Sequence, residues 1–198
     1  MIILGLTGSI GMGKTMAAGM FRRQGVPVHD ADACVHKALS NDPNVIRKVD
    51  KLFPGVVENG RIDRNTLGAR VFGDNQALAA LEAILHPVVR SDQIAFIGRA
   101  SVRRERLVVL DIPLLFETGA DLDCDFAAVV TAPPCVQRHR VLRRPGMTPE
   151  KLRNILSRQL PDAEKTRRAD FIIRSGLGRR MALRDVRQIV TLLRPQRN

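Results

Sequence analysis

Hydrophobic positions along this chain follow two patterns. Short continuous apolar runs with β-branched residues are typical of buried strands. They predict strands at residues 2–7, 26–29, 107–111, 126–131 and 171–173. Elsewhere apolar residues recur every three or four positions, which predicts helices at residues 14–24, 31–39, 43–53, 63–104, 134–144, 149–156 and 180–193. Buried strands that alternate with helices indicate an α/β fold, in which helices cover both faces of a parallel sheet.

The helical stretch between the second and third predicted strands is too long for an ordinary crossover. Asp42 and Pro43 have the types expected of an N-cap and a first helical residue, and residues 55–62 are rich in turn formers. Pro87 should break or kink the helical pattern of 63–104. We therefore expect residues 58–105 to form a helical insert.

A glycine-rich motif follows the first predicted strand and opens the first predicted helix. Residues 8–15 read Gly-Ser-Ile-Gly-Met-Gly-Lys-Thr, which matches the phosphate-binding pattern GxxxxGK[ST] without a mismatch. In such a loop the backbone N–H groups and the helix N-terminus bind phosphate oxygens, Lys14 reaches the β and γ phosphates, and the Thr15 hydroxyl ligates Mg²⁺. The motif predicts a site for a nucleoside triphosphate with Mg²⁺; a chance match in a loop is the alternative.

Two carboxylates follow predicted strands at the edge of the sheet where the loop lies. Asp32 comes soon after the second strand, where it can take a proton from an attacking hydroxyl or hold Mg²⁺ through water. Helix capping is the alternative for Asp32 and the simpler interpretation of Asp30. Asp111 ends the third predicted strand, a position from which an aspartate supports Mg²⁺ through water.

The formal net charge is +12, and it is unevenly spread. Residues 138–198 hold 17 basic and five acidic residues, so they carry the whole excess. Arg140 and Arg144 share one helical face, from which they can close over phosphates beside a Pro-Gly pair. A solvated basic face is the alternative there, and the simplest interpretation of a C-terminal set comprising Arg179, Arg180, Arg184, Arg187, Arg194 and Arg197.

The cysteines and the apolar segments indicate in which cellular compartment the protein is found. The three cysteines are an odd number without a CxxC pair, which favours reduced thiols. The apolar start lacks a basic segment and runs directly into the glycine-rich motif, so we expect no signal peptide. No apolar run approaches the length of a membrane span. These features predict a cytoplasmic protein that does not associate with membranes.

Several motifs occur together in a fixed order, and together they are more specific than the glycine-rich loop alone. They are TGSIGMGKT at 7–15, DAD at 30–32, HP at 86–87, PLLFE at 113–117, Arg140 with Arg144, Gln159, and ADFII at 169–173. In this order the chain resembles the dephospho-coenzyme A kinase family over nearly its whole length.

The resemblance implies a three-layer α/β/α P-loop NTPase fold and transfer of the ATP γ-phosphate to the ribose 3′-hydroxyl of dephospho-coenzyme A. This is the last step of coenzyme A biosynthesis, with Mg²⁺ as cofactor. It divides the chain into a core (1–57, 106–139 and 166–198), an acceptor-binding insert (58–105) and a lid (140–165). The expected partners are ATP and dephospho-coenzyme A, without nucleic acid, and the chain is expected to be a monomer or a small homo-oligomer.

The family's site residues can be transferred to matching positions. The catalytic residues implied are Asp32 as base, Lys14, and Arg140 as phosphate clamp. The implied ATP-binding set is Gly8, Ser9, Ile10, Gly11, Met12, Gly13, Lys14, Thr15, Met16, Arg140, Arg144 and Ser175. The implied acceptor-binding set is Asp32, His86, Leu114, Leu115 and Glu117. From position alone, His86 is either a helix-end group or a ligand contact.

The chain departs from the family's pattern at two positions. Met16 stands where many members have a second hydroxyl residue, and Ser175 stands where an asparagine near the adenine is common. Two other functions remain open: a kinase of another small nucleoside or nucleotide, and a nucleic-acid-binding P-loop ATPase. The absence of Trp and Tyr argues against the second alternative, because bases need aromatic stacking platforms. No guanine-reading NKxD element is present, which argues against a GTPase.

Overall fold

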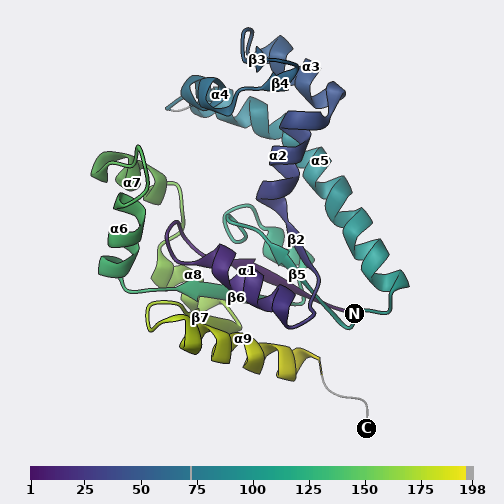
Figure 1. Ribbon diagram of the computed structural model, residues 1–198, viewed down its shortest axis with the longest axis vertical. Helices are drawn as coiled ribbons and strands as arrows, with labels where there is room; N and C mark the ends of the chain where they lie inside the picture. Colours follow the sequence, from purple (N-terminus) through teal and green to yellow (C-terminus); the bar gives the residue numbers. More distant parts are fainter. Residues whose placement is uncertain (72, 195–198) are drawn as a thin grey trace. The chain divides into compact units, whose positions relative to one another are not determined.

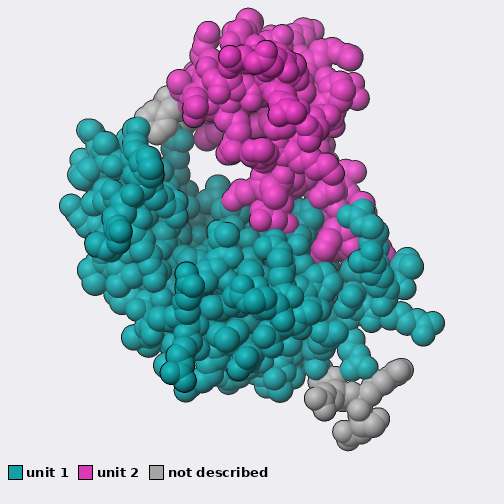
Figure 2. Space-filling model, in the orientation of Figure 1, with its two compact units in different colours: residues 1–29, 99–198 teal, residues 30–98 magenta. Residues whose placement is uncertain are grey.

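The computed structural model describes residues 1–71 and 73–194. The chain divides into two compact units, shown in Figure 2: Met1–His29 with Arg99–Asn198, and Asp30–Gly98. Arg197, part of the predicted basic C-terminal set, lies outside the described residues. None of the helices in the described ranges is long and apolar enough to cross a membrane.

The first unit is built on a five-stranded sheet with the order β2–β5–β1–β6–β7 (Figure 1). The strands are β1 (Ile2–Thr7), β2 (Val28–Asp30), β5 (Leu107–Asp111), β6 (Phe126–Thr131) and β7 (Phe171–Arg174). β1 pairs in parallel with β5 and with β6, and β6 pairs in parallel with β7. The predicted α/β fold with a parallel sheet is confirmed.

Both faces of this sheet are covered, because successive strand residues point to opposite sides. On β6, Ala128 and Val130 join one core cluster, whereas Ala127 and Val129 join another. The first cluster also takes buried residues from α1 (Lys14–Arg23) and α9 (Arg179–Leu193), which cover this face (Figure 1). The second contains Leu115, and Leu160 and Ala169, on either side of α8 (Asp162–Arg168), pack against it. The remaining elements of the unit are η1 (Ala120–Asp123), α6 (Pro134–Leu142) and α7 (Pro149–Leu156).

The second unit has its own core. Its elements are α2 (Ala31–Asn41), α3 (Pro43–Leu52), β3 (Val57–Glu58), β4 (Arg61–Ile62), α4 (Arg64–Val71) and most of α5 (Asn75–Val102). This unit, 30–98, starts and ends earlier than the expected insert, 58–105, whose bounds stay a prediction. Its earlier start has a physical reason: Leu39 of α2 and Val49 of α3 are buried in one cluster with Leu67 and Leu81.

Local structure in this unit differs from expectation at three places. Residues 55–62, expected as an irregular connection, contain the antiparallel β3–β4 hairpin. Asn59 and Gly60 at its turn both have positive φ, 50° and 75°, which suits a type I′ hairpin turn. The helical pattern of 63–104 forms two helices rather than one. Pro87 lies inside α5 and does not end it.

Candidate active site

The glycine-rich loop joins β1 to α1 in the first unit, as predicted. Gly11 and Gly13 have φ values of 77° and 93°, a left-handed conformation that glycine adopts without strain. Gly13 is the N-cap of α1 and makes no side-chain cap hydrogen bond. The first N–H groups of a helix have no partner within the helix itself, and the helix dipole favours an anion there.

Two other segments pack directly against this loop. A Cβ atom on Gly11 would lie 2.5 Å from Cγ2 of Val141, on α6. A Cβ atom on Gly13 would lie 3.2 Å from Oγ of Ser175, which follows β7. Both glycines are therefore required by close approach as well as by their positive φ.

Lys14 and Asp111 meet at the carboxyl edge of the sheet. Lys14 Nζ lies 2.7 Å from Asp111 Oδ1, and the Asp111 side chain is almost completely buried. Asp111 ends β5 and is in register with Leu6 of β1, so the parallel pairing of these strands sets its distance from the loop. The structure thus brings together two residues predicted separately, a cation that can reach phosphate oxygens and a carboxylate beside it.

Arg140 and Ser175 form a network that includes the loop. Arg140 Nη1 donates to Ser175 Oγ at 2.8 Å and to the Gly11 carbonyl at 3.4 Å, and Nη2 donates to the Ser175 carbonyl at 2.9 Å. Ser175 Oγ in turn donates to the Met12 carbonyl at 2.5 Å. The predicted phosphate clamp is therefore fixed beside the loop, and Ser175 is 1% exposed in this network.

Two glutamines hold Ile10 of the loop, one at each polar backbone atom. Gln137 of α6 donates from Nε2 to the Ile10 carbonyl at 2.9 Å. The Ile10 N–H donates to Oε1 of Gln159 at 3.2 Å. Gln159 is part of the predicted motif set but has no predicted role, and Gln137 is not among the predicted site residues. A long polar side chain one helical turn before Arg140 was the only local signal for Gln137.

The predicted PLLFE segment, residues 113–117, leaves β5 just after Asp111. Thr7 Oγ1 donates to the Pro113 carbonyl at 2.9 Å, which fixes the start of the segment to β1. Leu115 is fully buried in the core. The Glu117 carboxylate accepts from the Leu160 N–H at 2.9 Å and pairs with Lys165 Nζ at 2.8 Å. Lys165 is completely buried and was not predicted.

The other predicted donor-side residues lie at the ends of helices. Thr15 is exposed in the first turn of α1, where its hydroxyl can reach a ligand of the loop. Met16 is half-buried and packs against the core cluster of the first unit, so this position serves packing here. Arg144 is exposed just after α6.

Asp30, Asp32 and His86 belong to the second unit. Asp30 caps α2, because its Oδ1 accepts from the Ala33 N–H at 2.9 Å, as its simpler interpretation predicted. Asp32 lies in the first turn of α2 and is exposed; the capping alternative for Asp32 is excluded because Asp30 is the N-cap. His86 is exposed within α5, which excludes the helix-end alternative.

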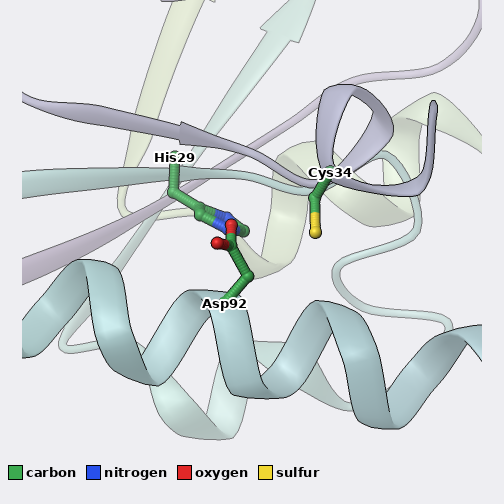
Figure 3. A group of neighbouring side chains, drawn as sticks. All are labelled: His29, Cys34 and Asp92. Carbon is green, nitrogen blue, oxygen red and sulfur yellow. The ribbon is translucent and has the colours of Figure 1, made fainter. Parts of the chain in front are cut away.

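A cavity of about 450 Å³ also lies in the second unit, with Cys34, Lys37 and Asp92 among its lining residues. Figure 3 shows Cys34 on α2 and Asp92 on α5; the third labelled residue, His29, belongs to the first unit. Burial, and then the charge and hydrogen bond of Asp92, raise the pKa of the Cys34 thiol to about 11. The thiol is therefore protonated at neutral pH, and Cys34 is a free cysteine rather than an activated nucleophile.

Known proteins resemble this chain in sequence and in fold. The family model described as dephospho-CoA kinase matches residues 2–178. A dephospho-CoA kinase of Mesorhizobium japonicum is 55% identical over 197 residues, which cover 100% of this chain and 99% of that protein. The Thermus thermophilus protein TT1252 has a crystal structure with a TM-score of 0.85 and 35% identity, over 98% of both chains.

A more distant structure supports the fold alone. The dephospho-CoA kinase from Campylobacter jejuni superposes with a TM-score of 0.65 at 22% identity, over 96% of both chains. The family model and the high identity over the whole chain establish more than the fold, and they agree with the motif order from which the resemblance was inferred. This chain belongs to the dephospho-CoA kinase family.

Proposed function

We propose that this chain transfers the γ-phosphate of ATP to the ribose 3′-hydroxyl of dephospho-coenzyme A, giving coenzyme A and ADP. The observation that carries the proposal is the glycine-rich loop, with Lys14 held 2.7 Å from Asp111, in a chain of the dephospho-CoA kinase family. Phosphoryl transfer depends mainly on positioning and on stabilising charge, which these groups supply.

On the donor side, the predicted loop residues 8–16 would surround the triphosphate. The N–H groups at the start of α1 and the Lys14 ammonium would bind its oxygens. Arg140, fixed by Ser175 and the Gly11 carbonyl, would stabilise charge on the transferring group, with Arg144 as a second cation from the end of α6. Ser175 would serve the ATP side through this network as well as through adenine contacts.

The residues present fit the Mg²⁺ that this chemistry requires. The Thr15 hydroxyl would be a direct ligand, and the buried Asp111 carboxylate would hold the ion through water. Both are oxygen donors, which Mg²⁺ prefers. When bound, Mg²⁺ would neutralise charge on the β and γ phosphates.

On the acceptor side, Asp32 would accept the proton of the attacking 3′-hydroxyl. Asp32 lies exposed in the first turn of α2, and the cap of that helix is Asp30. His86, exposed on α5, and Leu114, half-buried after β5, would contact the acceptor. Leu115 and Glu117 would support the acceptor site from inside the protein, because Leu115 is buried and the Glu117 carboxylate is paired with Lys165.

Three further expectations belong to this proposal. Residues 140–165 would form a lid over the nucleotide, and the chain would act in the cytoplasm as a monomer. It would use ATP and dephospho-coenzyme A, not nucleic acid, as its partners.

The test is ADP release from MgATP with a panel of acceptors: dephospho-coenzyme A, adenosine, AMP and shikimate. We expect release that depends on dephospho-coenzyme A and phosphate at the 3′ position of the product by mass spectrometry. Lys14→Met should abolish turnover while leaving a folded protein. Release with a nucleoside instead of dephospho-coenzyme A would refute the acceptor, and wild-type turnover in Lys14→Met would refute the loop assignment.

A further inference from the structure

Lys165 is an unusual residue in this fold, because its charged side chain is completely buried. It lies on α8, and Nζ is 2.8 Å from Glu117 Oε1. A buried ion pair is costly to desolvate and often contributes little to stability compared with apolar residues. Its presence therefore calls for a role other than stability.

The geometry around Glu117 indicates that role. Besides pairing with Lys165, Glu117 Oε1 accepts a hydrogen bond from the Leu160 N–H at 2.9 Å. Leu160 directly follows Gln159, whose Oε1 accepts from the Ile10 N–H in the phosphate-binding loop. A continuous series of contacts thus leads from the buried ammonium, through one carboxylate and one peptide, to the loop.

The other side of the same turn is fixed independently. Asp162, the first residue of α8, accepts a hydrogen bond from Thr131 Oγ1 at 2.5 Å at the end of β6. The backbone from 159 to 162 is therefore held between the segment after β5 and the end of β6. The Glu117 contact acts on Leu160, the residue that directly follows Gln159.

We propose that Lys165 and Glu117 are positioning residues for the phosphate-binding loop. Lys165 holds the Glu117 carboxylate, Glu117 fixes the Leu160 N–H, and this places the Gln159 amide oxygen on Ile10. Gln137 binds the Ile10 carbonyl from α6. Together the two glutamines hold the bend of the loop that directs its N–H groups at phosphate. This inference rests on the proposed function, because the loop is taken to bind the phosphates of ATP. Its test needs only nucleotide binding.

The test compares two double variants in a binding assay for MgADP that needs no acceptor. Glu117→Gln with Lys165→Met removes both charges but keeps an oxygen for the Leu160 N–H. Glu117→Leu with Lys165→Met removes that oxygen too, at similar side-chain volume. We expect the second pair to bind MgADP about five- to tenfold more weakly than the first, the worth of about one hydrogen bond.

A third variant separates positioning from a merely structural role. Gln159→Ala should itself weaken MgADP binding by a similar factor, and in its background the two double variants should bind equally, because the series of contacts already ends at Gln159. A difference that persists in the Gln159→Ala background would overturn the proposal. So would wild-type affinity in Gln159→Ala alone, a result that stays available even where the Glu117→Leu pair does not fold.

A matched control removes a charge from the same helix. Arg167 pairs with Glu164 at 2.8 Å on the exposed side of α8, so Arg167→Met should leave MgADP affinity within about twofold. An equal loss of affinity in Arg167→Met would overturn the proposal by showing a general effect of α8. Failure of the proposed function would instead leave wild-type MgADP binding intact without acceptor-dependent ADP release.

Discussion

Replacing Ser175 by alanine tests how the phosphate loop and Arg140 are held together. The substitution removes the hydroxyl that accepts from Arg140 Nη1 at 2.8 Å and donates to the Met12 carbonyl at 2.5 Å. Arg140 keeps two contacts, to the Ser175 carbonyl and, at 3.4 Å, to the Gly11 carbonyl. The hydroxyl is buried, so no bulk water takes its place freely.

The magnitude follows from these contacts. A hydrogen bond to a charged group contributes about 1.5–3 kcal/mol and a neutral one about 0.5–1.5 kcal/mol. Arg140 is half-exposed and retains two of its three bonds, so we take about 1–2 kcal/mol as the net effect on the transition state. This corresponds to a loss of about five- to thirtyfold in kcat/KM for ATP.

The assay is steady-state ADP release at saturating acceptor, with kcat and KM for ATP measured separately. The matched control is Thr166→Val, which removes a hydroxyl that donates to the Asp162 carbonyl on α8 and does not touch the loop. We expect kcat/KM of the control to stay within about twofold. Unchanged kcat/KM in Ser175→Ala would refute the reasoning, because Arg140 and the loop would then be held without the hydroxyl.

Three further predictions concern the acceptor base, a half-buried thiol and the loop. Asp32→Asn should lower kcat by about 10²-fold or more, whereas Asp30→Asn, which keeps a capping oxygen, should lower it by less than about threefold; equal losses would refute Asp32 as base. Burial, then the nearby aspartates, raise the pKa of the Cys124 thiol to about 12. At pH 8 iodoacetamide should therefore alkylate exposed Cys135 before Cys124, and unfolding should remove the difference; peptide mass spectrometry that finds Cys124 alkylated first would contradict this. Gly11→Ala should raise KM for ATP at least about tenfold, because its φ is 77° and its Cβ would lie 2.5 Å from a methyl carbon of α6; a normal KM would contradict this.

Local signals in the sequence were sufficient for the sheet of the first unit and for the loop. The apolar runs of β1, β5 and β6 can be recognised without knowing which residues they contact. The same is true of the start of α3, where Asp42 precedes a proline and its carboxylate caps the helix as predicted. The loop motif consists of three glycines, which allow positive φ or close approach of another segment, and a lysine at the start of the helix. Each of these signals lies within ten residues, so one window of sequence contains it.

The extent of the second unit could not be predicted in this way. Its boundary depends on Leu39 and Val49 packing with Leu81, residues that are far apart in sequence. The hairpin at Asn59 and Gly60 is a different case, because the Asn-Gly pair is a local turn signal. Each flanking strand has only two residues, too few for an alternating pattern that would predict strands on either side of the turn.

In the candidate site, single residues were predictable but their partners were not. Lys14 and Asp111 were each expected from their local motif, and only the parallel pairing of β1 with β5 brings them into contact. Gln159 reaches Ile10 across 149 positions of the sequence. Lys165 looked like one more basic residue of the last third, because burial is a property of the tertiary structure.

The basic excess of residues 138–198 can now be divided by what each charge contacts. Arg140 is fixed beside the phosphate loop, and Lys165 is neutralised by Glu117 inside the protein. Arg167 and Arg168 share Glu164 on the surface of α8, at 2.8 and 2.9 Å. Charges with such different surroundings do not contribute equally to the electrostatic potential at a ligand. Salt screens the interactions of exposed charges within about 10 Å at 0.1 M, whereas it screens those of partly buried charges much less. The net charge therefore reports little about function. Arg140 is held against the glycine-rich loop, and we propose that it is the arginine of this segment that contributes to phosphate binding.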